Sequence, residues 1–255
     1  MLNNYYFLGS SLPSLDLKKK PEISFEEFLL LCEMNLSKED LNKINLLRKY
    51  IDLLNLRLYW QNNKIDKRGL FNVKQIENIF LTKDDFFDFV FDFIEKYQKT
   101  EDRVLYFSFL QTSFYHYVFE NESGFLTFYF SLIRRTNIVL TALRAKRQNR
   151  DILKEFQFED KTDDLIIFFI SQKDSAKIEI LKEDEKILNI YENNISNPRK
   201  LNYELLKYLF NEIEHFAETK IFKIDQILSF AVMHMISEDF NRLDFEEGKK
   251  IIESL

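Results

Sequence analysis

Residues that form tight turns or bind metals are scarce in this chain of 255 residues. It contains four glycines, three prolines, one cysteine, one tryptophan and three histidines. All-β proteins of this length need many turns rich in glycine and proline, whereas a sequence rich in leucine, lysine, glutamate and isoleucine favours helices. The composition therefore predicts an all-α fold, and the length allows one or two domains.

The same scarcity excludes several kinds of site. Four glycines supply no Gly-rich phosphate-binding loop. No Cys/His spacing suits zinc, and Glu212 with His215 supplies only one of the two Glu-x-x-His steps of a four-helix di-iron site. No nucleophile-elbow motif is present. We therefore expect no catalytic residue, no metal and no cofactor, and predict that the chain is not an enzyme.

Long apolar runs are also missing. The run LIIFFI at 165–170 is far shorter than a membrane span, and the first residues have neither a basic region nor a long apolar core. The single Cys32 lies in the apolar run FLLLCEM, which is typical of a buried thiol in a reducing compartment. These features predict a cytoplasmic protein that meets a membrane only through partners. The net charge of −6 argues against nucleic-acid binding by overall charge.

The stretch Phe125–Arg150 is the most informative part of the chain. It begins apolar and aromatic and ends basic. At helical spacing, Leu126, Phe130, Ile133 and Leu140 fall on one line, and Asn137 interrupts that line. A polar amide on an apolar face needs hydrogen-bond partners, so Asn137 is expected to fix helix packing.

The same interruption occurs at Asn55. An isoleucine precedes each asparagine by four residues, a leucine follows each by three, and an arginine follows each by 13 residues. We interpret Asn55 and Asn137 as matching positions in two copies of one helix. The pseudo-repeat predicts two helical modules, an N-terminal one at 1–122 and a C-terminal one at 123–255.

Capping signals predict where further helices begin. Ser or Thr, Asn or Asp is followed three residues later by an acidic residue or glutamine at Ser24, Ser37, Asn72, Thr82 and Asp244. We expect residues 2–15 to be extended, 101–120 to form one helix, 165–170 to be helical, and 199–218 and 221–241 to form a helical pair. His116 is expected at the core or its boundary.

Two charged surfaces stand out. The line Asp85, Asp88, Asp92, Glu95 suits a solvated helix face, which we favour, a metal ion, a basic partner, or the basic helix end. The basic residues at 144–150 suit either the negative end of a helix dipole or an acidic partner bound through bidentate arginines. Our candidate partner-binding residues are Arg134, Arg135, Arg144, Lys146, Arg147 and Arg150, with Lys67 and Arg68 at the first copy.

Three segments suggest a family. TNIVLTALRAKRQNRDI at 136–152 resembles a helix-end motif of the C (or d) subunit of V/A-type rotary ATPases. NYYFLGSSLPSL at 4–15 and WQNNKIDKRGLF at 60–71 resemble a poorly characterised bacterial family whose genes lie among V-type ATPase genes. The C subunit is an all-helical funnel of three similar modules without catalytic residues. This chain is shorter than that, and 155–195 matches nothing in the pattern.

The resemblance implies a non-catalytic subunit of a V-type ATPase, a central-stalk adapter that couples the rotor shaft to the membrane proteolipid ring. Its partners would be the shaft and proteolipid-ring subunits, with one copy per complex on the cytoplasmic face of the membrane. A free-standing helical interaction or regulatory module is the alternative. A nucleic-acid-binding helical protein and an enzyme of unknown type are less supported by the sequence.

Overall fold

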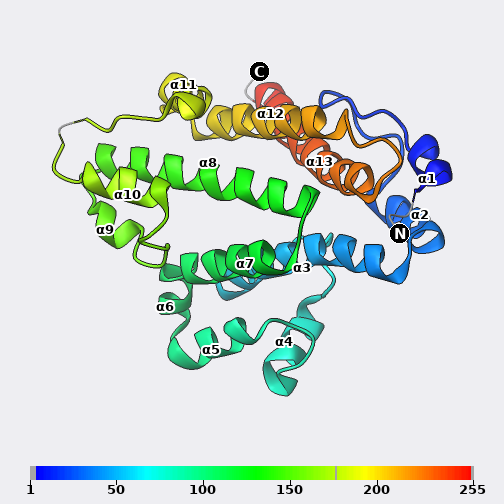
Figure 1. Ribbon diagram of the computed structural model, residues 1–255, viewed down its shortest axis with the longest axis horizontal. Coiled ribbons are helices and arrows are strands. Elements are labelled where there is room, and N and C mark those ends of the chain that lie inside the picture. The colour runs from blue at the N-terminus through cyan, green and yellow to red at the C-terminus, as the bar shows by residue number, and fades with distance from the viewer. Residues whose placement is uncertain (1–3, 176, 254–255) are drawn as a thin grey trace. The chain divides into compact units, whose positions relative to one another are not determined.

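Helices are the only regular elements in the part of the chain that the structure describes, residues 4–175 and 177–253. The computed structural model has thirteen α-helices, one 3₁₀ helix and no strand within those residues (Figure 1). The all-α prediction is confirmed. The helices are α1 Tyr6–Ser11, α2 Phe25–Asn35, α3 Lys38–Trp60, α4 Val73–Thr82, α5 Asp88–Lys96, α6 Thr100–Leu105, α7 Ser108–Asn121, α8 Phe125–Arg147, α9 Ile152–Glu155, α10 Asp164–Ser171, η1 Lys182–Asp184, α11 Glu185–Asn194, α12 Pro198–Ala217 and α13 Ile224–Glu253.

The chain divides into two compact units. One consists of residues 1–36 with 128–255, and the other consists of residues 37–127. Residues 1–36 are thus grouped with the C-terminal part, whereas the division predicted at 122/123 grouped them with the N-terminal half. None of the described helices is both long enough and apolar enough to cross a membrane.

In the unit 37–127, the long helix α3 packs against α6 and α7, and α5 packs against α7. Aromatic side chains fill the space between them. The ring of Tyr50 lies 5.0 Å from that of Phe114, and its hydroxyl is 3.0 Å from the hydroxyl of Tyr115. Phe93, at 1% exposure, lies between Trp60 and Phe109. The many phenylalanines therefore serve as core in this unit.

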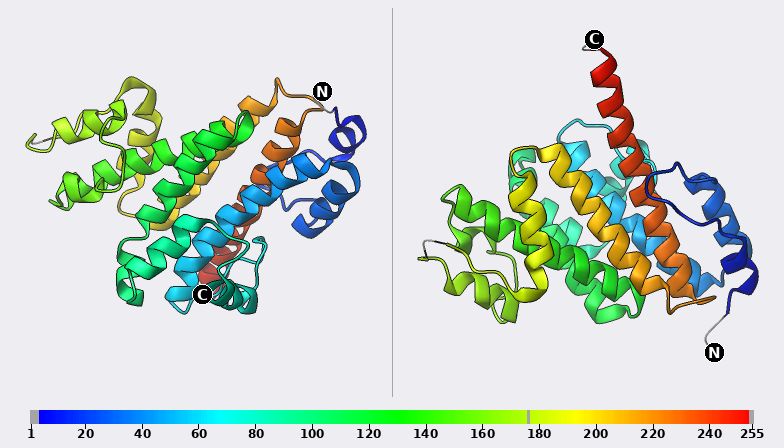
Figure 2. Two further views of the ribbon diagram at one scale, coloured as in Figure 1. Left: turned by 60° about the horizontal axis from the view of Figure 1, so that its bottom comes forward. Right: turned by 90° about the horizontal axis from the view of Figure 1, so that it is seen from above.

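In the other unit, α12 and α13 lie side by side, α2 packs on α13, and α1 packs on α2 (Figures 1 and 2). Phe28 and Cys32 of α2 are completely buried. Burial raises the pKa of the Cys32 thiol to about 12, so the thiol stays protonated at neutral pH. The prediction that Cys32 is buried is confirmed.

Residues 138–201 form a lobe with its own core within that unit. The second half of α8 contributes Val139, Ala142 and Ala145, and α10 contributes Ile166 and Phe169, all at 0% exposure. The predicted helix at 165–170 is confirmed as part of α10. The segment 155–195, which matched no known pattern, therefore packs its apolar side chains on α8.

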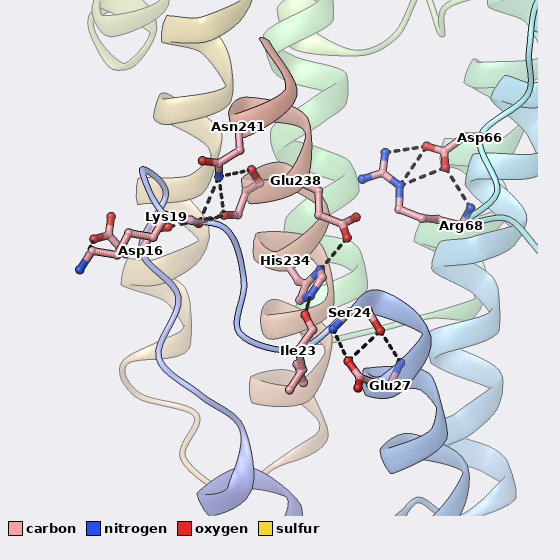
Figure 3. Close-up of polar contacts among 11 residues, drawn as sticks. Asp16, Lys19, Ile23, Ser24, Glu27, Asp66, Arg68, His234, Glu238 and Asn241 are labelled. Atoms are coloured by element: carbon pink, nitrogen blue, oxygen red, sulfur yellow. Dashed lines mark hydrogen bonds and ion pairs between the residues drawn. The ribbon is translucent and has the colours of Figure 1, made fainter. Parts of the chain in front are cut away.

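Several predicted helix starts are confirmed by their caps. Ser24 and Glu27 form a reciprocal capping box, in which the Glu27 carboxylate accepts from the Ser24 N–H at 2.7 Å (Figure 3). Asn72 and Gln75 form a second capping box, and Ser37 caps α3. In each case a side-chain oxygen satisfies a backbone N–H that the first helical turn leaves without a partner.

The predicted start at Thr82 is wrong. Thr82 is the last residue of α4, and its hydroxyl donates to the Asn78 carbonyl at 3.2 Å. Lys83 ends that helix in the left-handed region with φ 56°. The next helix begins at Asp88, so a capping pattern in the sequence fits more than one local structure. A start at Asp244 is also wrong, because α13 continues through this residue to Glu253.

Two further predictions are wrong because tertiary contacts override local patterns. Residues 6–11 are helical rather than extended, since Leu8 is buried at 1% exposure and the Tyr5 N–H donates to the Phe222 carbonyl at 2.7 Å. The expected helix at 101–120 is split into α6 and α7. At the break, Tyr106 packs on Tyr97 and Phe107 is buried at 2% exposure.

One face of α13 holds the connector that precedes α2 (Figure 3). His234, Ser237 and Asn241 recur at spacings of three and four, so they lie on one side of the helix. Their side chains bond backbone carbonyls of the connector: His234 Nε2 to Ile23 at 2.8 Å, Ser237 to Lys19 at 3.2 Å, and Asn241 to Leu17 at 3.2 Å and Lys19 at 3.1 Å. We call this set the α13 ladder.

The α13 ladder predicts a measurable stability effect. Asn241→Ala leaves the Leu17 carbonyl without this donor, so we expect the free energy of unfolding to fall by about 1–2 kcal/mol. Urea denaturation followed by circular dichroism measures this change. Asn202→Ala is the control, because Asn202 is exposed on α12. Equal stability losses in the two variants would show that the ladder does not hold the connector.

Candidate functional site

The predicted partner-binding cations lie mostly on α8, and the structure separates them into two groups. Arg134 and Arg135 are near the middle of the helix and have partners within the chain. Arg144, Lys146 and Arg147 lie in its last turns. Ala142 and Ala145 face the core at 0% exposure, while Arg144 and Arg147 are exposed. The last turn therefore presents its cations away from the lobe core.

Arg134 is held by two carboxylates. Its Nε and Nη2 donate to Glu159 Oε2 at 3.0 and 2.7 Å, and its Nη1 donates to Asp163 Oδ2 at 2.8 Å. Burial by itself lowers the pKa of Arg134, and the two carboxylates offset this so that the net shift is upward. Asp163 also caps α10 by accepting from the Leu165 N–H at 2.9 Å. Arg134 thereby fixes the start of α10.

Arg135 binds a carboxylate further along the chain, at η1. Its Nε and Nη2 donate to the two oxygens of Asp184 at 2.7 and 2.9 Å, and it also pairs with Glu183. Asp184 is 1% exposed. A buried carboxylate needs such a bidentate partner, because an unpaired charge there costs several kcal/mol. The expectation that Arg134 and Arg135 belong to an exposed surface is therefore wrong: both are internal clamps on residues 152–195.

The remaining basic residues form the surface that we call the basic end: Arg144, Lys146 and Arg147. Within the described residues, Arg144 and Arg147 make no ion pair or hydrogen bond through their side chains. Lys146 is half-buried and has only a long 3.4 Å contact to the Lys173 carbonyl. Arg150 follows the helix and pairs with Glu155 at 3.0 Å, so its charge is partly neutralised within the chain.

The two candidate cations at the first copy of the predicted repeat, Lys67 and Arg68, lie in the loop between α3 and α4. Asn55, at 0% exposure, donates to the Asp66 carbonyl at 2.9 Å and accepts from the Asp66 N–H at 2.7 Å. Arg68 is half-buried and pairs with Asp66 at 2.6 Å, whereas Lys67 is exposed (Figure 3). Asn55 thus fixes a loop rather than the packing of two helices, and Arg68 is held by the same loop.

Asn137 does not occupy an equivalent environment. It is exposed on α8, whereas its neighbours Thr136 and Ile138 are buried. Leu126, Phe130 and Leu140 of the predicted apolar line are buried, and Asn137 lies outside the buried face, which also includes Ile138 and Ala142. The matched spacing of the two asparagines therefore does not reflect a matched role.

Two residues that the sequence did not single out complete the loop site. Asp52 lies three residues before Asn55, and Arg48 lies four residues before Asp52, so all three face the loop from one side of α3. Arg48 donates to the carbonyls of Arg68 at 3.0 Å and Gly69 at 2.8 Å. Asp52 accepts from the Leu70 N–H at 2.8 Å and, more weakly, from the Phe71 N–H at 3.3 Å. We call Arg48, Asp52 and Asn55 the α3 ladder.

Gly69 allows the loop backbone to lie close to the Asp52 side chain of α3. A Cβ atom there would lie 2.1 Å from Asp52 Oδ1, which is far inside van der Waals contact. Asp52 is completely buried. Burial raises its pKa to about 6, even though the two N–H groups, Asn55 and Arg48 favour the charged form. Polar residues at helical spacing among apolar ones on α3, followed by a loop glycine, were the signal for this site.

The histidines show no metal site. His116 and His215 are both exposed, so the expectation that His116 lies at the core or its boundary is wrong. Glu212 pairs with Lys186 at 2.8 Å. His234 is completely buried, and its Nδ1 lies 3.9 Å from Glu238 Oε1 (Figure 3). In the described part of the chain, no three His, Cys, Asp or Glu residues are grouped to hold a metal ion.

These features define an all-α protein in which polar helix faces clamp non-helical connectors. The chain belongs to the family described as "Protein of unknown function (DUF2764)", whose model matches residues 2–255. An uncharacterized protein of Chlamydia pneumoniae is 28% identical, and one of Chlamydia muridarum is 26% identical. Each alignment covers 98% of this chain and 97% of the relative. No solved structure matches this chain.

The family assignment corrects the resemblance drawn from the sequence. The resemblance to the C subunit of V/A-type ATPases rested on the short segment at 136–152, and the resemblance to a bacterial family encoded among V-type ATPase genes rested on 4–15 and 60–71. The DUF2764 model matches almost the whole chain, and the relatives matched along it are uncharacterized Chlamydia proteins. The chain is therefore assigned to DUF2764, and the recognition as a C-like subunit is wrong.

The Arg135 clamp predicts a stability loss. Arg135→Met leaves Asp184 buried without its bidentate partner, so we expect the free energy of unfolding to fall by roughly 2–3 kcal/mol. Chemical denaturation measures it. Arg144→Met is the matched control and should change stability by less than about 0.5 kcal/mol, because Arg144 is exposed. A variant Arg135→Met as stable as the control would rule out the clamp.

Asp52 predicts a pH dependence with a defined sign. Its raised pKa gives the folded state one more bound proton than the unfolded state between the ordinary value of 3.8 and about 6. Stability therefore falls as pH rises through this window, by at most about 3 kcal/mol. Asp52→Asn removes this pH-dependent part of the unfolding free energy. It also disturbs one of the hydrogen bonds from the Leu70 and Phe71 N–H groups.

The measurement is the difference in unfolding free energy between wild type and Asp52→Asn across the acidic range. That difference, wild type minus variant, should decrease from pH of about 4 to about 6. Asp92→Asn, at an exposed position of α5, serves as the control and should show no comparable fall. A flat difference for Asp52→Asn would mean that the carboxyl is charged throughout the window.

Proposed function

We propose that this chain works by binding another protein, without catalysis of its own, and that it binds through the basic end of α8. The observation that carries the proposal is the exposure of Arg144 and Arg147, which have no side-chain partner within the described residues. The other arginines of this helix, Arg134 and Arg135, are neutralised internally. Two uncompensated guanidinium groups on one helix end are suited to an acidic surface.

The chemistry of arginine narrows the partner. A guanidinium group binds a carboxylate through two parallel hydrogen bonds, which gives orientation as well as attraction. Exposed pairs of this kind contribute at most about 1 kcal/mol each, so binding also needs apolar contact. Leu153, three residues after Arg150, is 41% exposed, so an exposed apolar side chain follows the basic end closely in the sequence. We infer a partner with acidic residues bordering an apolar patch.

The assembly to examine first is the V-type rotary ATPase. In this form of the proposal the chain is a single-copy adapter on the cytoplasmic side of the membrane, between the rotor shaft and the proteolipid ring. In such an adapter the basic end is the contact surface. The alternative is a free-standing helical module that binds one acidic regulatory partner. Both forms of the proposal use the basic end and differ in the partner that it binds. Identifying that partner therefore distinguishes them.

The experiment is an affinity pull-down of tagged chain from detergent-solubilised membranes and cytosol of the source organism, read by mass spectrometry. Recovery of the ATPase catalytic, shaft and proteolipid subunits together supports the adapter role. Recovery of a different acidic protein supports the free-standing module. Recovery of nucleic acid with salt-sensitive binding, or of no partner while the ATPase subunits are present in the extract, contradicts the proposal.

Charge reversal tests the surface itself. Arg144→Glu with Arg147→Glu should lower partner recovery about tenfold or more, because attraction becomes like-charge repulsion. The control is Lys38→Glu with Lys74→Glu, which makes the same change in net charge at exposed positions of α3 and α4. Unfolding curves check that both double variants fold. Equal recovery by the two would place the binding surface elsewhere.

A further inference from the structure

A hollow of about 470 Å³ lies within the unit 37–127, apart from the basic end of α8. Small-molecule sites fall between about 300 and 1,000 Å³ and combine apolar walls with a few convergent polar groups. This hollow has both kinds of lining. Its walls are formed by Asn42, Asn45, Leu46, Lys49, Leu70, Phe87, Tyr117 and Glu122.

The polar side of the hollow is one face of α3. Asn42, Asn45 and Lys49 recur at spacings of three and four, so their side chains share that face. Within the described residues, neither amide side chain forms a hydrogen bond. The Lys49 ammonium lies 5.5 Å from the centre of the Phe87 ring and has no ion-pair partner in the same part of the chain. Three solvent-accessible polar groups that have no hydrogen-bond or ion-pair partner among the described residues therefore line the hollow.

A carboxylate lines the hollow from a different element. Glu122 follows α7, and its backbone is fixed because its N–H donates to the Val118 carbonyl at 2.9 Å and its own carbonyl accepts from the Thr127 hydroxyl at 3.0 Å. Burial raises the pKa of Glu122, and the Lys43 charge opposes this rise. The Lys43 ammonium itself pairs with Asp40 at 2.8 Å. Among the described residues, Glu122 and Lys49 form no ion pair with each other.

The apolar side is held in place by the core. Phe87, at 8% exposure, packs edge-on against Phe114 at 5.5 Å and against Tyr117 at 5.0 Å. Leu70 is set by the α3 ladder, because its backbone N–H donates to Asp52. Tyr117 keeps 37% of its surface exposed. The walls thus offer an aromatic surface that does not depend on a bound molecule for its shape.

We propose that this hollow binds a small zwitterion that carries an apolar ring, either an aromatic amino acid or a short peptide that begins with one. The ligand carboxylate pairs with Lys49 and its ammonium group pairs with Glu122. The ring packs against Phe87 and Tyr117, and the amides of Asn42 and Asn45 bond the remaining polar atoms. A ligand with both charges satisfies two ionised groups that the chain itself leaves apart.

The test is isothermal titration of the full chain with L-phenylalanine and with the dipeptide L-phenylalanylglycine. Each probe is compared with its C-terminal amide, which lacks the carboxylate, and its N-acetyl form, which lacks the ammonium group. We expect saturable binding, with each neutralised form weakened about tenfold or more. Tighter binding of the amino acid identifies that class, and tighter binding of the dipeptide identifies a peptide.

Variants assign the binding to this hollow. Lys49→Gln should selectively weaken the probes that carry a carboxylate, and Glu122→Gln those that carry an ammonium group. Lys74→Gln is the matched control at an exposed position of α4 and should bind like wild type. Circular dichroism checks that each variant folds. If Lys49→Gln or Glu122→Gln does not fold, Asn45→Ala is used in its place. The proposal is overturned if neither zwitterion binds, if the neutralised forms bind equally well, or if no folded hollow variant differs from the control.

Discussion

The structure depends most on how helix side chains satisfy the backbone of connectors that have no regular partners. An all-α protein has no strand ladder to pair these groups, and a buried N–H or carbonyl without a partner is costly. On α3, the buried Asp52 carboxylate, Asn55 and Arg48 bond the backbone of residues 66–71. On α13, Asn241 and its neighbours do the same for the connector before α2. In each unit, one long helix thereby determines the path of a non-helical segment.

Ion pairs extend this arrangement to the lobe at 138–201. Consecutive arginines of α8 point to opposite ends of one segment, Arg134 to the start of α10 and Arg135 to the buried Asp184 of η1. Asp184 is buried at 1% exposure, so losing its partner is expensive. The consequence for function is a division of charge along one helix. The middle of α8 serves stability, whereas Arg144 and Arg147 at its end are exposed and form the surface proposed to bind a partner.

The unit 37–127 uses its α3 helix on two sides. One face carries the ladder that fixes the loop, and the adjacent face lines the hollow with Asn42, Asn45 and Lys49. The two sides are coupled through Leu70, whose backbone is bound by Asp52 while its side chain lines the hollow. A rigid loop gives the hollow a stable wall, and preorganised walls lower the entropic cost of binding a small ligand. The same set of hydrogen bonds therefore supports both stability and the proposed ligand site.

Composition, helical periodicity and capping signals by themselves determined the all-α class, the buried Cys32 and the starts of α2, α3 and α4, because these depend on local chain chemistry. Only the tertiary structure decided which charges are internal. Arg134 and Arg144 look alike in sequence, but the carboxylates that neutralise Arg134 come from 25 and 29 residues away. The two asparagines also share a spacing, yet Asn55 is buried under a loop and Asn137 is exposed. Long-range burial decides such roles, and a single sequence does not record which distant segment packs on a given helix face.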